Sequence, residues 1–311
     1  MNSDRLSFAL LIGLGVVWGS AFIAIRYILD EGASPFLFVL VRMLASAPLM
    51  ALVALVAREP LPAKRDLVVS AVLGGAFVMG GYQVMLFWGE QFTSGGIAGV
   101  LVAASPLFTA VLSWFFLRHE SFGRVGALGL AAGFVGVALL FEPEIAAGGS
   151  FSTLGLLSVL AAALAFAVGS VLLRKWRTGG ETSWGASVEF AAGAVFALPF
   201  VIVFEPHPYF PVGSGTLIAT FYLVGVAGVL GFAVYFALHR RTGPSRANLV
   251  SFISPISALG LGVLILGEQY AVIQLGGFAL IALGLFLLQR DWARRATTAS
   301  GRPSPDRAER E

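Results

Sequence analysis

Long apolar runs separated by short polar connections dominate this chain. A helix needs about 20 mainly apolar residues to cross roughly 30 Å of hydrocarbon, because each residue rises about 1.5 Å. With breaks at charge clusters and Pro/Gly-rich stretches, the qualifying runs are 6–29, 35–57, 67–89, 94–117, 122–141, 152–173, 184–204, 215–238, 247–267 and 271–289. The last division rests on Gly267-Glu268-Gln269-Tyr270, since the apolar run across it is otherwise twice the span length. The pattern predicts an all-α integral membrane protein with ten transmembrane helices.

The two ends of the chain differ in character. The first run follows Arg5 and is too long for the apolar region of a signal peptide, so we expect a retained helix. Residues 290–311 are polar and contain Pro303 and Pro305. Such a stretch cannot bury enough apolar surface to fold, and it predicts a disordered cytoplasmic tail.

Composition supports a membrane protein and excludes several classes. Apolar residue types make up 58% of the 311 residues, charged types 12%, and the mean hydropathy is +0.88. These values exclude a soluble enzyme and a disordered regulator, and the absence of Cys excludes a disulfide scaffold. The net charge of +3 does not indicate nucleic acid binding, because the basic residues lie between apolar runs. The expected partners are membrane lipid and a small-molecule substrate.

The connections between the runs alternate in charge. Odd-numbered connections contain Asp30, Glu31, Glu90, Glu142, Glu144, Glu205 and Glu268, with no Lys or Arg. Even-numbered connections contain Arg58, Lys64, Arg65, Arg118, Arg124, Arg174, Lys175, Arg177, Arg240, Arg241 and Arg246. The positive-inside rule places the basic connections, and with them both termini, in the cytoplasm. A wrong helix count would scramble this alternation.

An internal repeat divides the chain. Both copies contain Ser-Pro, then Glu, then two glycines: Ser105-Pro106, Glu120, Gly129 and Gly136, against Ser254-Pro255, Glu268, Gly277 and Gly284. From Glu to the glycines the offsets are 9 and 16 in both copies. Gly19-Ser20 similarly matches Gly169-Ser170, 150 residues on. The predicted units are 6–141 and 152–289, each with five helices.

The odd number of helices in each unit determines how the two units are oriented in the membrane. Because five is odd, successive units enter the membrane from opposite faces and form an inverted repeat. That architecture is typical of secondary transporters, which bind substrate near the midplane between the repeats and rock one half against the other. An ancient duplication without transport is the alternative.

The sequence resembles the drug/metabolite transporter superfamily, and within it the EamA-type members. The residues that carry the resemblance are Trp18-Gly19-Ser20, Phe22, Pro35, Arg42 and the two Pro-to-Glu-to-Gly blocks, and the likeness extends over residues 6–289. The resemblance implies two EamA repeats in a cytoplasmic (inner) membrane carrier, usually an exporter of amino acids or related metabolites. Length and layout fit the aromatic amino acid exporters of the family. An efflux carrier for drugs or other metabolites is the alternative. Val168 stands where a second copy of Trp18 is expected.

Ionisable side chains lie inside the spans, away from their ends, at Arg26, Arg42 and Glu189. A charge there costs about 2.5–3.5 kcal/mol on insertion scales and needs a partner or a wet cavity. Arg26 can pair with Asp30, four residues on. Arg42 and Glu189 are predicted gating or structural residues in opposite halves of the bilayer, so we expect them not to pair.

Polar and aromatic residues at mid-depth are the predicted substrate-cavity lining. They are Trp18, Ser20, Met79, Tyr82, Gln83, Ser105, Phe166, Ser170, Ser251 and Ser254. Gln83 is the most informative, because lipid cannot satisfy its amide. Hydrogen bonding between helices is the alternative for Gln83, and an interfacial aromatic belt is the alternative for Tyr82.

Pro106 and Pro255 interrupt the hydrogen-bond ladder in mid-span. Their recurrence in both units favours a role in gating over a static kink.

The sequence offers no catalytic or metal-binding motif. It lacks HExxH, GxGxxG and Walker patterns, and His119, His207 and His239 fall in connections. We therefore predict no enzyme activity, metal or cofactor, and favour a carrier over a channel, which would show charged rings or a filter-like repeat. With no carboxylate or histidine near the midplane, a facilitator is favoured over a carboxylate-based antiporter.

Overall fold

The computed structural model describes residues 2–116, 123–242 and 249–300, and the regular structure in those ranges is helical. The helices are α1 (Asn2–Asp30), α2 (Pro35–Val56), α3 (Lys64–Val69), η1 (Ser70–Gly81), α4 (Tyr82–Glu90), α5 (Gly95–Val102), α6 (Ser105–Phe116), α7 (Arg124–Ala146), α8 (Ser150–Trp176), α9 (Ser183–Phe204), α10 (Ser214–Phe221), η2 (Tyr222–Leu230), α11 (Gly231–Thr242), α13 (Val250–Leu266) and α14 (Val272–Ser300). Glu120 and His119, singled out above, lie outside the described residues.

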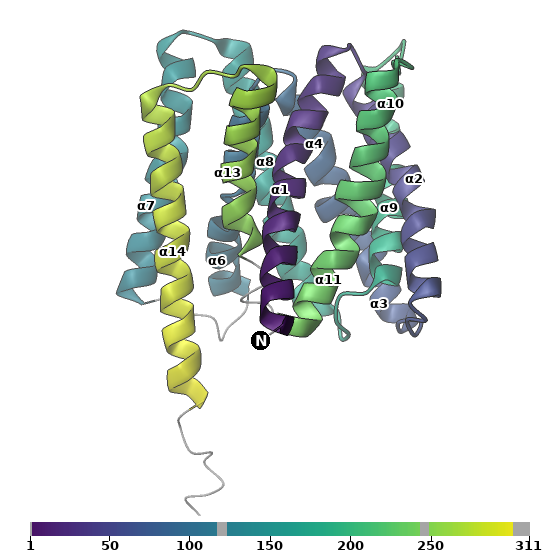
Figure 1. Ribbon diagram of the computed structural model, residues 1–311, viewed down its shortest axis with the longest axis vertical. Coiled ribbons are helices and arrows are strands. Elements are labelled where there is room, and N and C mark those ends of the chain that lie inside the picture. The colour runs from purple at the N-terminus through teal and green to yellow at the C-terminus, as the bar shows by residue number, and fades with distance from the viewer. Residues whose placement is uncertain (1, 117–122, 243–248, 301–311) are drawn as a thin grey trace, which may run out of the picture.

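These helices account for the predicted spans. In the described ranges, nine continuous stretches are long and apolar enough to cross a membrane, and α13 is a shorter apolar helix of 17 residues. The third span combines α3, η1 and α4, the fourth combines α5 and α6, and the eighth combines α10, η2 and α11. The prediction of an all-α membrane protein is confirmed. Figure 1 shows the helices running side by side, with the N-terminus and the far end of α14 at the same end of the bundle.

Two spans contain long π-helical segments that the sequence analysis did not predict. They are η1 in the third span and η2 at the corresponding place in the eighth. The wider π turn is rare and is found often at functional sites. Four glycines in η1, at positions 74, 75, 80 and 81, leave room for close neighbours, and α9 packs directly on this segment.

The repeated glycines explain how the two units pack. A Cβ atom on Gly129 would lie 2.7 Å from the carbonyl oxygen of Gly284, and one on Gly284 would lie 2.5 Å from that of Gly129. Gly136 and Gly277 stand in the same reciprocal relation, at 2.5 and 2.7 Å. Because the residue numbers run in opposite directions, α7 and α14 are antiparallel and touch backbone to backbone. Only glycine permits this approach.

Carboxylates from one unit cap helices of the other. Glu205, after α9, accepts from the backbone N–H groups of Phe36 and Leu37 at the start of α2, both over 2.8 Å. Glu59, after α2, accepts from the N–H of Ser183 at the start of α9 over 2.7 Å. The first N–H groups of a helix have no acceptor within the helix, so each carboxylate accepts hydrogen bonds from groups that would otherwise be unpaired. Its negative charge also interacts favourably with the positive end of the helix dipole. Burial raises the pKa of Glu205, and the bonds from α2 oppose that shift.

The end of α14 differs from the predicted tail. The sequence places a disordered segment from Arg290, whereas the helix continues to Ser300. Residues 292–297, Trp-Ala-Arg-Arg-Ala-Thr, include Ala and Arg, which are strong helix formers, and the helix needs no burial to extend by a few turns. Residues 301–311 lie outside the described ranges.

Candidate functional site

Arg42 and Gln83 form a buried polar pair between α2 and α4. Arg42 Nη1 donates to Gln83 Oε1 over 2.9 Å, and the two residues are 7% and 6% exposed. The guanidinium carbon lies 5.9 Å from the centroid of the Phe87 ring. Arg42 Nε has no hydrogen-bond partner, and no described carboxylate forms a salt bridge with this side chain. A buried cation is left with donors unused.

The local structure explains why these two residues meet. Pro35 opens α2 at its first turn, where a missing N–H costs nothing, and Arg42 follows two turns later. Gln83 is the second residue of α4 and comes directly after the π-helical segment η1. The wider winding of η1 changes the face on which the following side chains lie, so the depth of Gln83 could be predicted from hydropathy but its direction could not.

Trp18 and Ser20 of α1 contact the eighth span, across the boundary between the two predicted units. Trp18 Nε1 donates to the carbonyl oxygen of Ala227 over 3.1 Å. Ser20 Oγ and Tyr222 Oη lie 2.5 Å apart. The Trp18 ring packs against Phe232 and Tyr235, with centroid distances of 5.8 and 5.3 Å. The sequence analysis missed these aromatic partners, because they sit in an apolar run in which many aromatic residues only pack.

The other residues predicted to line the substrate cavity lie in several separate contacts between helices. Tyr82 packs on Phe166 with ring centroids 5.6 Å apart, and Met79 is buried against α9. Ser105 donates to the carbonyl oxygen of Val102 over 2.5 Å, and the carbonyl oxygen of Ser254 faces Gly19. Ser170 is partly exposed. The structure thus places Trp18 and Ser20 both against the eighth span, brings Tyr82 together with Phe166, and places the other predicted serines elsewhere.

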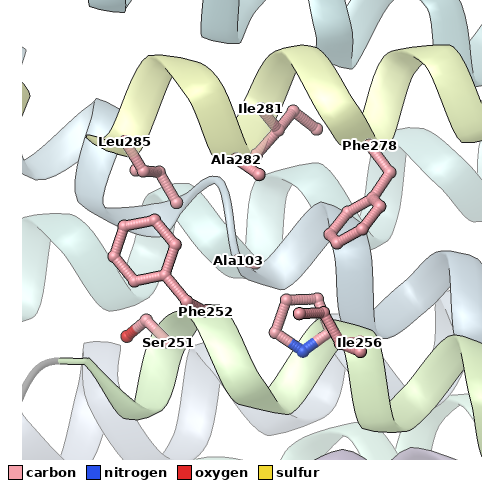
Figure 2. A pocket seen from close by; sticks show the side chains of 9 residues that line it. Ala103, Ser251, Phe252, Ile256, Phe278, Ile281, Ala282 and Leu285 are labelled. Carbon is pink, nitrogen blue, oxygen red and sulfur yellow. The ribbon is translucent and has the colours of Figure 1, made fainter. Parts of the chain in front are cut away.

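A small cavity lies beside Pro255 of α13. It measures about 40 Å³ and is lined by Ala103, Ser251, Phe252, Pro255, Ile256, Phe278, Ile281, Ala282 and Leu285. Figure 2 shows it between α13 and α14, beside the turn at Ala103 where α5 ends. This volume suits a few waters at most and is far below that of a ligand pocket.

The fourth span is broken at this point. Helix α5 ends at Val102 and α6 begins at Ser105, so Pro106 lies in the first turn of a new helix. Ser105 bonds to the carbonyl oxygen that the break leaves free, which lowers the cost of non-helical backbone in the membrane. Pro255, by contrast, lies inside the continuous helix α13. The predicted interruption is therefore visible as a broken helix in one unit only.

A larger cavity opens at the end of the bundle that holds the acidic connections, here called the acidic end. Its volume is about 450 Å³, and it is lined by Arg26, Asp30, Gln91, Phe92, Thr93, Ser94, Glu144, Ser152, Leu266 and Glu268. Arg26 forms a salt bridge with Asp30 over 2.7 Å, which confirms the expected pairing. Arg26 Nη1 also donates to the carbonyl oxygens of Glu90, Gln91 and Thr93.

Glu268 links the two units beside this cavity. Its carboxylate accepts from the N–H groups of Gly95 and Gly96 over 2.8 and 3.0 Å, and from the hydroxyl of Tyr270. Burial, and then the hydrogen bond to Glu268, raise the pKa of Tyr270, so its phenol stays neutral and donates. The connection that holds Glu268 was predicted, but its role as the cap of α5 was not.

The opposite, basic end is tied by other ion pairs. Arg177 Nη2 pairs with Glu189 Oε1 over 2.5 Å and also donates to Ser70. Asp66 accepts from the N–H groups of Thr178 and Gly179, each over 2.9 Å. Glu189 and Arg42 therefore have separate partners, as expected. These contacts join the third span to the connection between α8 and α9.

Several titratable residues assigned to connections lie inside helices instead, among them Glu90 and His239. Glu90 ends α4 and is 0% exposed, and His239 lies in the last turn of α11 against Tyr235. The correction has a simple cause, since hydropathy places a charged residue at the edge of a run but cannot tell whether neighbouring helices cover it. Among the described residues, no group of three or more His, Asp or Glu is arranged to hold a metal ion.

Taken together, the described helices and the cross-unit contacts define a multi-pass membrane protein built from two repeats. The comparisons assign the family. The EamA-like transporter family model matches residues 5–142 and 153–290, so the chain belongs to that family.

Two bacterial relatives have names that call them transporters. The chain is 28% identical over 281 residues to an uncharacterized inner membrane transporter, YedA, of Escherichia coli, covering 90% of each chain. It is 27% identical over 289 residues to an uncharacterized transporter, YoaV, of Bacillus subtilis, covering 92% of this chain and 97% of that one. A solved crystal structure matches with a TM-score of 0.61 at 20% identity, covering 91% of this chain and 97% of the other. That likeness shows the fold alone.

Proposed function

We propose that this protein is a secondary carrier for small metabolites with a carboxylate group, amino acids foremost, and that it works by alternating access between its two repeats. The observation that carries the substrate class is Arg42, a buried cation with donors unused and no described carboxylate partner. The preference for aromatic or other neutral amino acids, and for export, rests on the family resemblance.

Arg42 has the chemistry of an anion anchor. A guanidinium offers a planar set of donors that matches a carboxylate, and it stays charged when buried. Charged groups inside a membrane protein are costly and usually mark substrate or ion pathways. Gln83 holds one side of the guanidinium, which leaves the remaining N–H groups for a ligand. A carboxylate bound there would supply the charge partner that no described side chain provides.

Alternating access needs ties that form and break at both ends. The Glu268 cap on α5 joins the units at the acidic end, and the bonds from the N–H groups of Thr178 and Gly179 to Asp66 join them at the basic end. Both are polar contacts that water can replace when one end opens. We also propose that the basic end, and with it both termini, faces the cytoplasm, by the positive-inside rule. The acidic-end cavity then faces the outside.

Uptake into proteoliposomes tests the proposal. We expect saturable uptake of at least one neutral amino acid from a panel that includes L-phenylalanine, with competition by other amino acids but not by their amides. Gln83→Ala should lower the rate roughly 3- to 15-fold, the range of an interhelical hydrogen bond in a membrane. Gln269→Ala, at an exposed position, is the matched control and should change little. Uptake of the whole panel no faster than into protein-free liposomes would contradict the proposed function.

The proline sites give a second expectation. The double variant Pro106→Ala/Pro255→Ala should slow transport several-fold per folded molecule while changing the folded yield less, because it removes the two interruptions in the ladder. Initial rates and gel-filtration yield are measured on the same preparations. A lower yield with an unchanged rate per molecule would indicate static kinks.

A further inference from the structure

Glu90 is a buried acid that the proposed substrate site does not use. It ends α4, is 0% exposed, and neither of its carboxylate oxygens has a hydrogen-bond partner among the described residues. Its backbone carbonyl, not its side chain, accepts from Arg26. The side chain is therefore fully covered by protein, next to Gln91 and Arg26, which line the acidic-end cavity.

The charged groups around Glu90 do not balance the negative charge of its ionised carboxylate. Arg26 directs its donors to Asp30 and to the backbone carbonyls at the end of α4. Glu268 is the other nearby acid and is held by the amides at the start of α5. Around this group, one guanidinium thus faces three acids if all are ionised.

Charged groups farther away, on the helices packed around Glu90, do not change this excess of acids over basic groups. Arg42 of α2 contacts Phe87 one turn before Glu90, and Glu144 at the end of α7 lines the cavity. Tyr270 donates to Glu268, and between residues 150 and 173 α8 carries no Asp, Glu, Lys, Arg or His.

Two physical facts link the charge of Glu90 to the shape of the protein. An ionised carboxylate buried without donors is costly, whereas the neutral acid carries its own O–H and can remain. Ionisation therefore favours a conformation in which water reaches the side chain. Such a conformation loosens the packing around Glu90, where α8 lies against Gly89 and Arg26 of α1 donates to the Glu90 carbonyl oxygen.

We propose that Glu90 is a proton-binding site whose protonation holds the acidic end closed and whose deprotonation opens it. The carboxylate takes up one proton from water at the acidic end as that end closes and releases it to the same side as the end opens, so the populations of the two conformations follow the pH on that side. The protein then has a proton-binding acid outside the midplane, whereas the expectation of a facilitator rested on the absence of a carboxylate or histidine near the midplane. The proton-binding step is independent of the substrate, while its coupling to flux rests on the proposed function.

Distance measurements without substrate test the proposal. The chain has no Cys, so a pair of cysteines introduced at Glu31 and Ala147 takes spin labels specifically; both positions are exposed and lie close in sequence to the cavity-lining residues Asp30 and Glu144. In liposomes between roughly pH 5 and 9, we expect the population with the longer label distance to grow as the pH rises. Glu90→Gln should abolish this response and keep the short distance at every pH. Glu90→Asp should restore it with a shifted midpoint.

Controls separate Glu90 from its neighbours. Glu144→Gln makes the same change at a partly exposed acid of the same cavity and should leave the response intact. No pH response in the parent protein, or an unchanged response in Glu90→Gln, would overturn the proposal. Since no amino acid is present, a negative result on the transport panel does not alter the reading of these distances.

Discussion

Replacing Arg42 with Gln should abolish high-affinity transport of amino acids and leave the protein folded. Truncating one partner of a buried, hydrogen-bonded charge pair costs about 2–5 kcal/mol, so the KM for uptake should rise about 30-fold or more. Arg42→Lys keeps the charge but loses the planar donor set, so its KM should lie between those of the parent protein and Arg42→Gln. The measurement is the concentration dependence of L-phenylalanine uptake in proteoliposomes.

Two controls test whether the change in KM comes from the substrate carboxylate. Arg240→Gln changes the same residue type at an exposed position, 3.9 Å from Glu59, and should leave the KM within about twofold, because exposed ion pairs contribute little. Any residual uptake of phenylalaninamide should be equal in the parent and in Arg42→Gln. If Arg42→Gln retains the parental KM, the substrate carboxylate does not bind there.

Among the variants proposed for this protein, Gly277→Val should lower the free energy of unfolding the most. A Cβ atom there would lie 2.7 Å from the carbonyl oxygen of Gly136, and that backbone is held in α7 and cannot yield locally. Overpacking typically costs about 1–3 kcal/mol, and a clash with backbone lies at the upper end of that range. We expect a lower midpoint of thermal unfolding and a smaller monodisperse fraction on gel filtration.

Gly276, the neighbour of Gly277 in α14, is the matched control. A Cβ atom at Gly276 would meet nothing within 4 Å, so Gly276→Val makes the same change in the same helix without the clash. Its unfolding midpoint should stay close to that of the parent protein. Equal losses in the two variants would show that helix propensity, and not the contact between α7 and α14, sets the effect.

Hydropathy determined most of the architecture. The spans, the alternating charge of the connections and the repeated Ser-Pro, Glu and Gly pattern follow from the sequence, because a lipid environment forces long apolar helices with local hydrogen bonding. The pair of Arg26 with Asp30 was also predictable, since both lie on one face of one helix. Local spacing is sufficient wherever the partners are neighbours in the chain.

Tertiary structure alone decided the partners of the buried polar groups. Arg42 meets Gln83, Ser20 meets Tyr222, and Glu189 meets Arg177, in pairs between 12 and 202 residues apart. The π-helical segments rotate the side chains that follow them, and the packing of separate helices leaves the Glu90 carboxylate without a donor among the described residues. Sequence determines how deep a residue lies in the membrane. Which neighbour it faces depends on how the helices rotate and pack, and hydropathy carries no information about that rotation.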